Sequence, residues 1–160
     1  MVGYTDSDLG ADVVERRSTG WMAFYLNENL ITWCSHKQKS VALPSCELEF
    51  MEATAAAKQA LWLRTLISEI TKEKPKVVTL FVDNNSAIAL MKNHVFHGRS
   101  KHIDIKYHFM RECVEWSQII VKRVCTDEQK ADALTKALPA GKLTVMRHLF
   151  GVRDLSVCQD

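Results

Sequence analysis

The sequence predicts an α/β domain in which a mixed five-stranded sheet is flanked by helices. Runs of apolar and β-branched residues typical of strands come first, and a long alanine-rich helical pattern separates them from the later strands. The 160 residues, 47% of them hydrophobic, suffice for one core. We therefore expect a single domain over residues 1–160, with its core at 3–138 and a helical C-terminal extension at 139–160.

The first part of the chain predicts three antiparallel strands, at residues 2–9, 20–26 and 30–35. The second and third are separated by Asn27-Glu28-Asn29, which is a hairpin signal. A loop that includes Lys37, Gln38 and Lys39 should then lead to a helix start at Pro44 and Ser45.

The long helix should span 46–70, where alanines recur on one face and allow close approach to a sheet. After Pro75, the unalternated apolar run 77–82 predicts a strand buried on both faces. If this strand and the first are neighbours, they form the middle of the sheet. The remaining expected elements are a helix through 87–92, a helix from 103 to 116, a strand at 118–124, a helix that begins near 126 and carries 131–134, and a helix at 141–150.

Composition narrows the class of protein. The net charge is only +2, and no apolar run is long enough to cross a membrane. The N-terminus lacks the pattern of a signal peptide, so we expect an intracellular protein, cytoplasmic or nuclear, with no membrane partner. The five cysteines include no Cys-x-x-Cys pair, which argues against a disulfide framework or a zinc knuckle.

Acidic residues fall where several predicted elements end or begin. Asp6 lies on the first strand, and Asp83 lies where the buried strand ends, which is where ligands bind in open α/β sheets. Glu47, Glu49 and Glu52 lie near the start of the long helix. Glu49 is in line with the small face of this helix, which favours it as the buried ligand, and a solvated face is the structural alternative for Glu52. Asp132 falls in a late helix. Each acid has a structural alternative, and at Asp83 the alternative is that this residue or one of its neighbours caps the next helix.

A pocket of four carboxylates needs neutralisation, because two unit charges about 4 Å apart repel by about 4 kcal/mol at an effective dielectric near 20. Oxygen ligands without histidine or thiolate favour Mg²⁺ or Mn²⁺. Two such ions roughly 3.5–4 Å apart can activate water and stabilise the leaving oxygen in phosphodiester cleavage. A basic segment at 94–102 could meet phosphates, although charge alone favours a solvated connection between helices.

Four acidic strings resemble, in order and in matching elements, the motifs of ribonuclease H: Tyr4-Thr5-Asp6, Glu49-Phe50-Met51-Glu52-Ala53, Val82-Asp83-Asn84-Asn85-Ser86 and Ala131-Asp132-Ala133-Leu134. Longer stretches are similar to the ribonuclease H end of copia-type LTR-retrotransposon polyproteins, at residues 17–21, 33–38, 41–45, 87–90, 101–112 and 131–136. The likeness covers about residues 3–150.

The resemblance implies a ribonuclease H fold and hydrolysis of the RNA strand of RNA/DNA hybrids with two Mg²⁺ or Mn²⁺ ions. It implies that the metal ligands and catalytic residues are Asp6, Glu49, Asp83 and Asp132. It also implies a reverse transcriptase domain as a possible upstream partner. Many relatives carry a histidine shortly before the last Asp, whereas 124–130 has none. Slow or strongly metal-dependent turnover is therefore expected, with Glu128 as a partial substitute.

Reading an RNA/DNA hybrid requires contacts to 2′-hydroxyls across a shallow minor groove. The candidates for substrate binding are Asn84, Asn85, Ser86, Ser45 and Gln38, with Arg99, Lys101 and His102 for the phosphates of the DNA strand. Two rival functions stay open. One is a catalytically weak or inactive descendant that binds nucleic acid or a protein, and the other is a different nuclease or an integrase-like member of the same fold.

Overall fold

The structure is a computed structural model that describes residues 1–8, 17–41, 45–92, 101–125, 128–130 and 139–152. Within these ranges, one mixed sheet has the strand order β3-β2-β1-β4-β5. The strands are β1 (Val2–Asp8), β2 (Arg17–Leu26), β3 (Asn29–Val41), β4 (Val78–Val82) and β5 (Ile119–Arg123). β1, β2 and β3 pair antiparallel, and β4 and β5 are added in parallel. The predicted fold class is confirmed, including the central position of β1 and β4.

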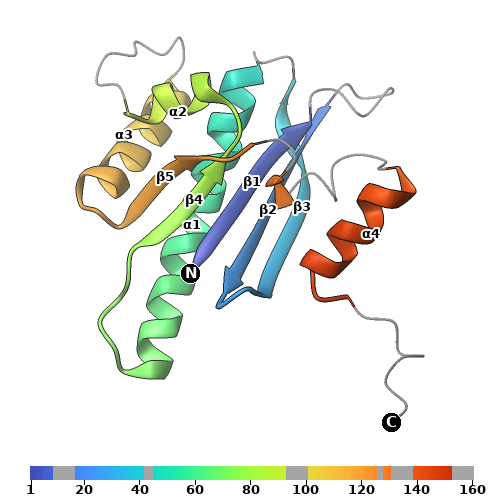
Figure 1. Cartoon of the computed structure of the whole chain (residues 1–160). Helices are drawn as coiled ribbons and strands as arrows, with labels where there is room; N and C mark the ends of the chain where they lie inside the picture. The colour runs from blue at the N-terminus through green and yellow to red at the C-terminus, as the bar shows by residue number, and fades with distance from the viewer. Residues whose placement is uncertain (9–16, 42–44, 93–100, 126–127, 131–138, 153–160) are drawn as a thin grey trace.

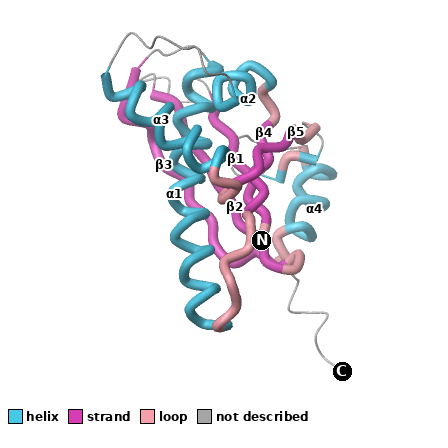
Figure 2. Tube along the Cα trace, turned by 90° about the vertical axis from the view of Figure 1, so that its left-hand side faces the viewer, coloured by secondary structure: helices cyan, strands magenta, loops and turns pink. Residues whose placement is uncertain are grey.

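Helices flank the sheet on both faces (Figures 1 and 2). They are α1 (Ser45–Thr71), α2 (Asn85–Lys92), α3 (Lys101–Glu115) and α4 (Ala140–Leu149). α1, α2 and α3 lie together on one side, and α4 lies apart from them, beside β2 and β3. Among the described helices, none is long and apolar enough to cross a membrane.

The main core lies between the sheet and α1. Ala53, Ala56, Ala57 and Ala60 have no exposed surface, and they belong to the same buried cluster as the apolar side chains of β4. Because an alanine adds only a methyl group to the backbone, this face lets the helix axis approach the strands closely. The predicted small face of the long helix is therefore confirmed. Its first turns are held against the C-terminal end of β1, where the acidic residues lie.

The opposite face of the sheet has a smaller core. Trp21, Ala23 and Tyr25 of β2 are almost completely buried there, and Phe150, just after α4, packs against them. Trp33 of β3 stacks on Trp21 with 6.4 Å between ring centroids and stays 58% exposed. Strand alternation explains the division, because neighbouring residues of β2 point to opposite faces.

Two sequence predictions of loops are wrong. Residues 37–39 continue β3 instead of forming a connection, because Lys37 pairs with Thr19 of β2 and the side chain of Gln38 is buried. Lys101 and His102 begin α3 instead of belonging to the basic loop. The expected helix from 126 that carries 131–134 falls mostly outside the described residues.

Candidate active site

The parallel pairing of β1 and β4 brings two of the predicted acids together. Val2 pairs with Thr79, Gly3 with Leu80 and Tyr4 with Phe81. The same offset, continued along both strands, sets Asp6 level with Asp83. Asp6 is 3% exposed and Asp83 is half-buried directly after β4. The two carboxylates therefore occupy the carboxyl ends of adjacent parallel strands, where α/β sheets bind ligands.

Glu49 reaches the same place from the second turn of α1. The side chain of Asn84 donates a hydrogen bond from Nδ2 to Oε1 of Glu49 over 3.2 Å. Oδ1 of Asn84 accepts from the backbone N–H groups of Ser86 at 2.8 Å and Ala87 at 3.1 Å. Asn84 therefore caps the first turn of α2 and at the same time ties α2 to Glu49.

The electrostatics of Glu49 reflect its acidic neighbours. Burial raises the pKa of its carboxyl to about 8, and the charges of Asp83 and Asp6 add to the rise, while the Asn84 hydrogen bond opposes it. A carboxyl is affected in this way only by charges close to it, since water screens distant ones. Asp6, Glu49 and Asp83 thus form one electrostatic cluster, as the sequence predicted, and we call these three residues the acidic cluster.

The acidic cluster has oxygens that the described protein atoms leave unsatisfied. Glu49 Oε2 and Asp83 Oδ1 are buried, and no N–H or hydroxyl group of the described residues donates to them. The proton that Glu49 keeps can bridge the two side chains, and this hydrogen bond with Asp83 adds to the raised pKa of Glu49. Buried carboxylate oxygens without donors fit a divalent cation that prefers oxygen ligands. However, no three His, Cys, Asp or Glu side chains within the described ranges are grouped closely enough to hold a metal ion. Asp132, the fourth predicted ligand, lies outside the described residues.

Sequence reasoning missed Gln129, which is fully buried at the edge of this site. Its Nε2 donates a 2.9 Å hydrogen bond to the carbonyl oxygen of Thr5, the residue before Asp6. The next residue, Lys130, places its Nζ 4.3 Å from the ring centroid of Tyr25. The chain is thereby fixed to the central strands three residues before Asp132. In the sequence, Gln129 fits the last position of a capping box that starts at Thr126, and its burial was missed because it depends on a contact across the chain.

Glu52 corrects a second expectation. A solvated face was the structural alternative for Glu52, but it is 1% exposed and lies over Gly20 of β2. A Cβ at position 20 would collide with Oε2 of Glu52, so the glycine makes the room for the carboxyl group. Burial raises the pKa of Glu52 to about 8, and Asp6 adds to the rise. The helical periodicity of α1 could not reveal this, because the space comes from another strand.

The predicted substrate-binding residues are placed as follows. Asn85, Ser86 and Ser45 are exposed near the acidic cluster, at the starts of α2 and α1. Gln38 is buried and donates from Nε2 to the carbonyl oxygen of Leu48 over 3.2 Å. Arg99 and the side chains of Lys101 and His102 lie outside what the structure describes. For each of these residues, and for Asn84, a role in binding the substrate remains a prediction.

Comparison with solved structures gives the class of fold. LC11-RNase H1, solved in complex with an RNA/DNA hybrid, matches with a TM-score of 0.59 at 12% identity over 83% of this chain and 91% of that one. The prototype foamy virus protease-reverse transcriptase matches with a TM-score of 0.56 at 14% identity over 94% of this chain and 20% of that one. The protein therefore has the ribonuclease H fold.

Comparison of sequences places it more narrowly. The retrovirus-related Pol polyprotein from transposon TNT 1-94 of Nicotiana tabacum is 37% identical over 154 residues, which are 96% of this chain and 12% of that polyprotein. No family model matches. The chain is thus a homologue of the Pol polyproteins of plant transposons and spans about an eighth of the length of this relative.

Proposed function

We propose that the protein is a metal-dependent endoribonuclease that hydrolyses the RNA strand of RNA/DNA hybrids. The observation that carries the proposal is the acidic cluster at the carboxyl ends of β1 and β4, where Glu49 has a pKa raised to about 8 among two other carboxylates. A ribonuclease H fold with acids in this place supports phosphodiester hydrolysis, and the relative solved with a hybrid supports the substrate.

Asp6, Glu49, Asp83 and Asp132 would hold the metal ions, Mg²⁺ or Mn²⁺. When bound, two such ions supply an activated water and stabilise the leaving 3′-oxygen. The chain itself fixes the ligands. β1 and β4 hold Asp6 and Asp83 through the sheet, and Asn84 holds Glu49 through its Nδ2. Two carboxylate oxygens of the cluster receive no hydrogen bond from an N–H or hydroxyl group of the described residues. Bound cations would therefore reduce the repulsion between the carboxylates of the acidic cluster.

The hybrid would lie across the starts of α1 and α2, where the exposed Ser45, Asn85 and Ser86 surround the acidic cluster. Arg99, Lys101 and His102 would contact the phosphates of the DNA strand. A reverse transcriptase domain is the proposed partner, since a comparable domain occupies 20% of the foamy virus protease-reverse transcriptase. Hybrids are produced during reverse transcription, so both proposals fit one process.

The test is the variant Asp83→Asn, which removes one charge from the acidic cluster with little change in shape. Asp104→Asn is the matched control, because Asp104 is half-buried in the first turn of α3 and is not among the charges that perturb Glu49. We expect Asp83→Asn to abolish cleavage of a hybrid with Mg²⁺ or Mn²⁺, while Asp104→Asn retains it. Single-stranded RNA should stay intact with every variant. Equal cleavage by Asp83→Asn and the unmodified protein would overturn the site.

A second candidate is a catalytically weak or inactive module that binds nucleic acid or a protein. It is favoured by one observation, that no three possible ligands within the described ranges are grouped to hold a metal ion. Measurable binding of the hybrid with no cleavage in either Mg²⁺ or Mn²⁺ would support it. Cleavage of duplex DNA would instead identify a different nuclease of the same fold.

A further inference from the structure

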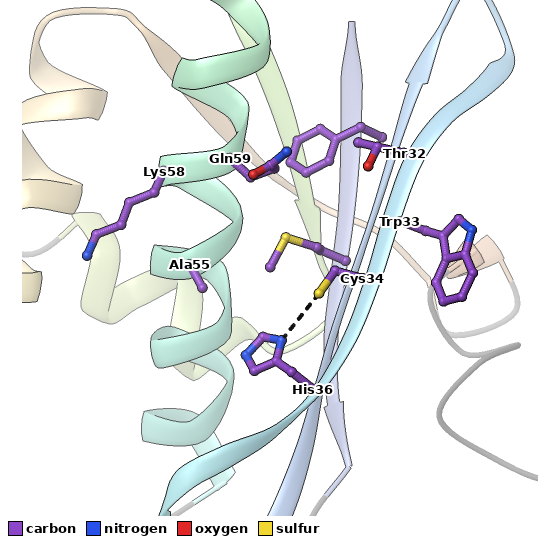
Figure 3. Close-up of a pocket in the computed structure, with 9 residues that line it drawn as sticks. Thr32, Trp33, Cys34, His36, Ala55, Lys58 and Gln59 are labelled. Carbon is purple, nitrogen blue, oxygen red and sulfur yellow. Dashed lines mark hydrogen bonds between the residues drawn. The ribbon is translucent and has the colours of Figure 1, made fainter.

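A cavity of about 380 Å³ lies between the edge strand β3 and α1, apart from the acidic cluster. Cys34 and His36 line it from the strand, and Ala55 and Lys58 line it from the helix (Figure 3). Cys34 is exposed, so a reagent in solution can reach its sulfur. The function proposed above makes no use of this cavity.

Cys34 and His36 are two residues apart on β3 and therefore project from the same face of the strand. The Sγ atom of Cys34 lies 3.8 Å from Nδ1 of His36 (Figure 3). On the other side of the imidazole ring, Nε2 of His36 lies 3.4 Å from Oε2 of Glu52. The imidazole thus bridges an exposed thiol and a buried carboxyl group.

Glu52 is held in this position by its surroundings. Its carboxyl group fills the space that Gly20 leaves on β2, and only 1% of the residue is exposed. Burial and the charge of Asp6 favour the neutral carboxylic acid, whereas Gln38 and the charge of Lys106 favour the carboxylate. Because the carboxyl group cannot turn towards solvent, Oε2 remains directed at His36 and orients the ring.

The arrangement does not suit a metal ion. The thiol and the carboxyl group contact opposite nitrogens of one ring, so a single ion cannot touch both together with the imidazole. The same geometry does suit proton transfer. In the molecules whose Glu52 is ionised, a fraction that grows as the pH approaches its pKa of about 8, the carboxylate accepts from Nε2–H of a neutral imidazole. Nδ1 of that imidazole is then bare and faces the thiol, which is how a cysteine nucleophile is activated.

We propose that Cys34, His36 and Glu52 form a thiol–imidazole–carboxylate relay that makes Cys34 a site of covalent modification by small disulfides. In this step the thiol proton passes to Nδ1 of His36, and the sulfur attacks one sulfur of the disulfide. A new sulfur–sulfur bond forms as the old one breaks, and the departing thiolate takes the proton from His36. The group that becomes attached occupies the cavity between β3 and α1.

The test measures the reaction of each cysteine with oxidised glutathione at pH 7.5 by mass spectrometry of peptides. Cys125 is the internal control, because it is also exposed and lies in the same molecule. A free thiol is only a few per cent thiolate near neutral pH, so activation should make Cys34 react roughly tenfold faster than Cys125. The variants His36→Gln and Glu52→Gln should each bring the rate of Cys34 to within about threefold of that of Cys125.

His36→Gln is the decisive variant, since His36 is partly exposed on an edge strand and its replacement is compatible with folding. The rate of Cys113 in each variant reports whether the fold is intact, because this thiol is buried and reacts only when the structure opens. Equal rates for Cys34 and Cys125 in the unmodified protein would overturn the proposal. An unchanged Cys34 rate in His36→Gln would overturn it as well, and an unchanged rate in Glu52→Gln would remove the carboxylate from the relay.

Discussion

Asp83 combines a cost in stability with the role proposed for it in metal binding. Its Oδ1 is buried without a hydrogen-bond donor among the described residues, and its charge raises the pKa of Glu49. Two like charges near each other destabilise the folded state unless a proton or a cation intervenes. A bound cation would remove this repulsion, and the free energy so released would contribute to its affinity. Stability without metal and response to metal should therefore change together when Asp83 loses its charge.

We expect Asp83→Asn to melt at a higher temperature than the unmodified protein in a metal-free buffer at pH 9, above the Glu49 pKa of about 8, where the carboxyl group of Glu49 is charged. Relief of about 1 kcal/mol of repulsion corresponds to about 2–4 °C for a chain of this size. Addition of Mg²⁺ should raise the melting temperature of the unmodified protein more than that of the variant. Thermal unfolding with and without chelator provides the measurement. A lower melting temperature for the variant without metal would show that the charge stabilises the fold.

Glu52 gives the folded state a pH dependence. Its carboxyl has a pKa raised from 4.5 to about 8, so between these values the folded protein keeps a proton that the unfolded chain releases. The contribution of Glu52 to stability is complete below pH 4.5 and is lost as the pH rises through about 8. The loss is at most about 1.4 kcal/mol per pH unit for one group.

The variant Glu52→Gln removes this titration and keeps the shape of the side chain. We expect urea unfolding to give a free energy that falls from pH 5.5 to pH 8 in the unmodified protein, and that falls less in the variant. Glu49 titrates in both proteins. The difference between their slopes of unfolding free energy against pH is therefore due to Glu52. Parallel slopes would mean that Glu52 is not the buried carboxylic acid described here.

At the scale of elements, α2 is the piece that connects local structure to the site. Its first turn is capped by Oδ1 of Asn84, and the Nδ2 of the same side chain holds Glu49 of α1. β4 ends at Val82, directly before this turn, so the strand, the acid and the cap follow one another along the chain. A displacement of the strand, of Asp83 or of the Asn84 cap would therefore move the other two as well.

Asn84→Ala should therefore reduce the free energy of unfolding by about 1 kcal/mol, which is typical for the loss of a helix cap. Asn85→Ala is the matched control. Asn85 is the exposed first residue of α2, and its replacement should change stability by less than about 0.5 kcal/mol. Chemical denaturation of the two variants supplies the comparison. Equal free energies of unfolding for Asn84→Ala and Asn85→Ala would show that Asn84 does not stabilise α2 as a cap.

At the scale of the whole molecule, the sequence predicted the order of elements along the chain and the places of Asp6, Glu49 and Asp83 at the ends of elements, because both follow from periodicity and from turn signals. It did not predict what depends on contacts between distant segments. Gln129 is buried against Thr5, and Glu52 is buried over Gly20. The continuation of β3 through 37–39 was missed for the same reason, since Lys37 and Gln38 look like loop residues until their partners are known.

The most direct test of the account is strand-specific cleavage of an RNA/DNA hybrid by this protein. The hybrid is labelled in turn on its RNA and its DNA strand and is incubated with Mg²⁺, with Mn²⁺ or with a chelator. The account predicts internal cuts in the RNA strand alone, with either metal, and none with the chelator. Cleavage of the DNA strand, cleavage in the presence of the chelator, or an intact RNA strand with both metals would contradict it.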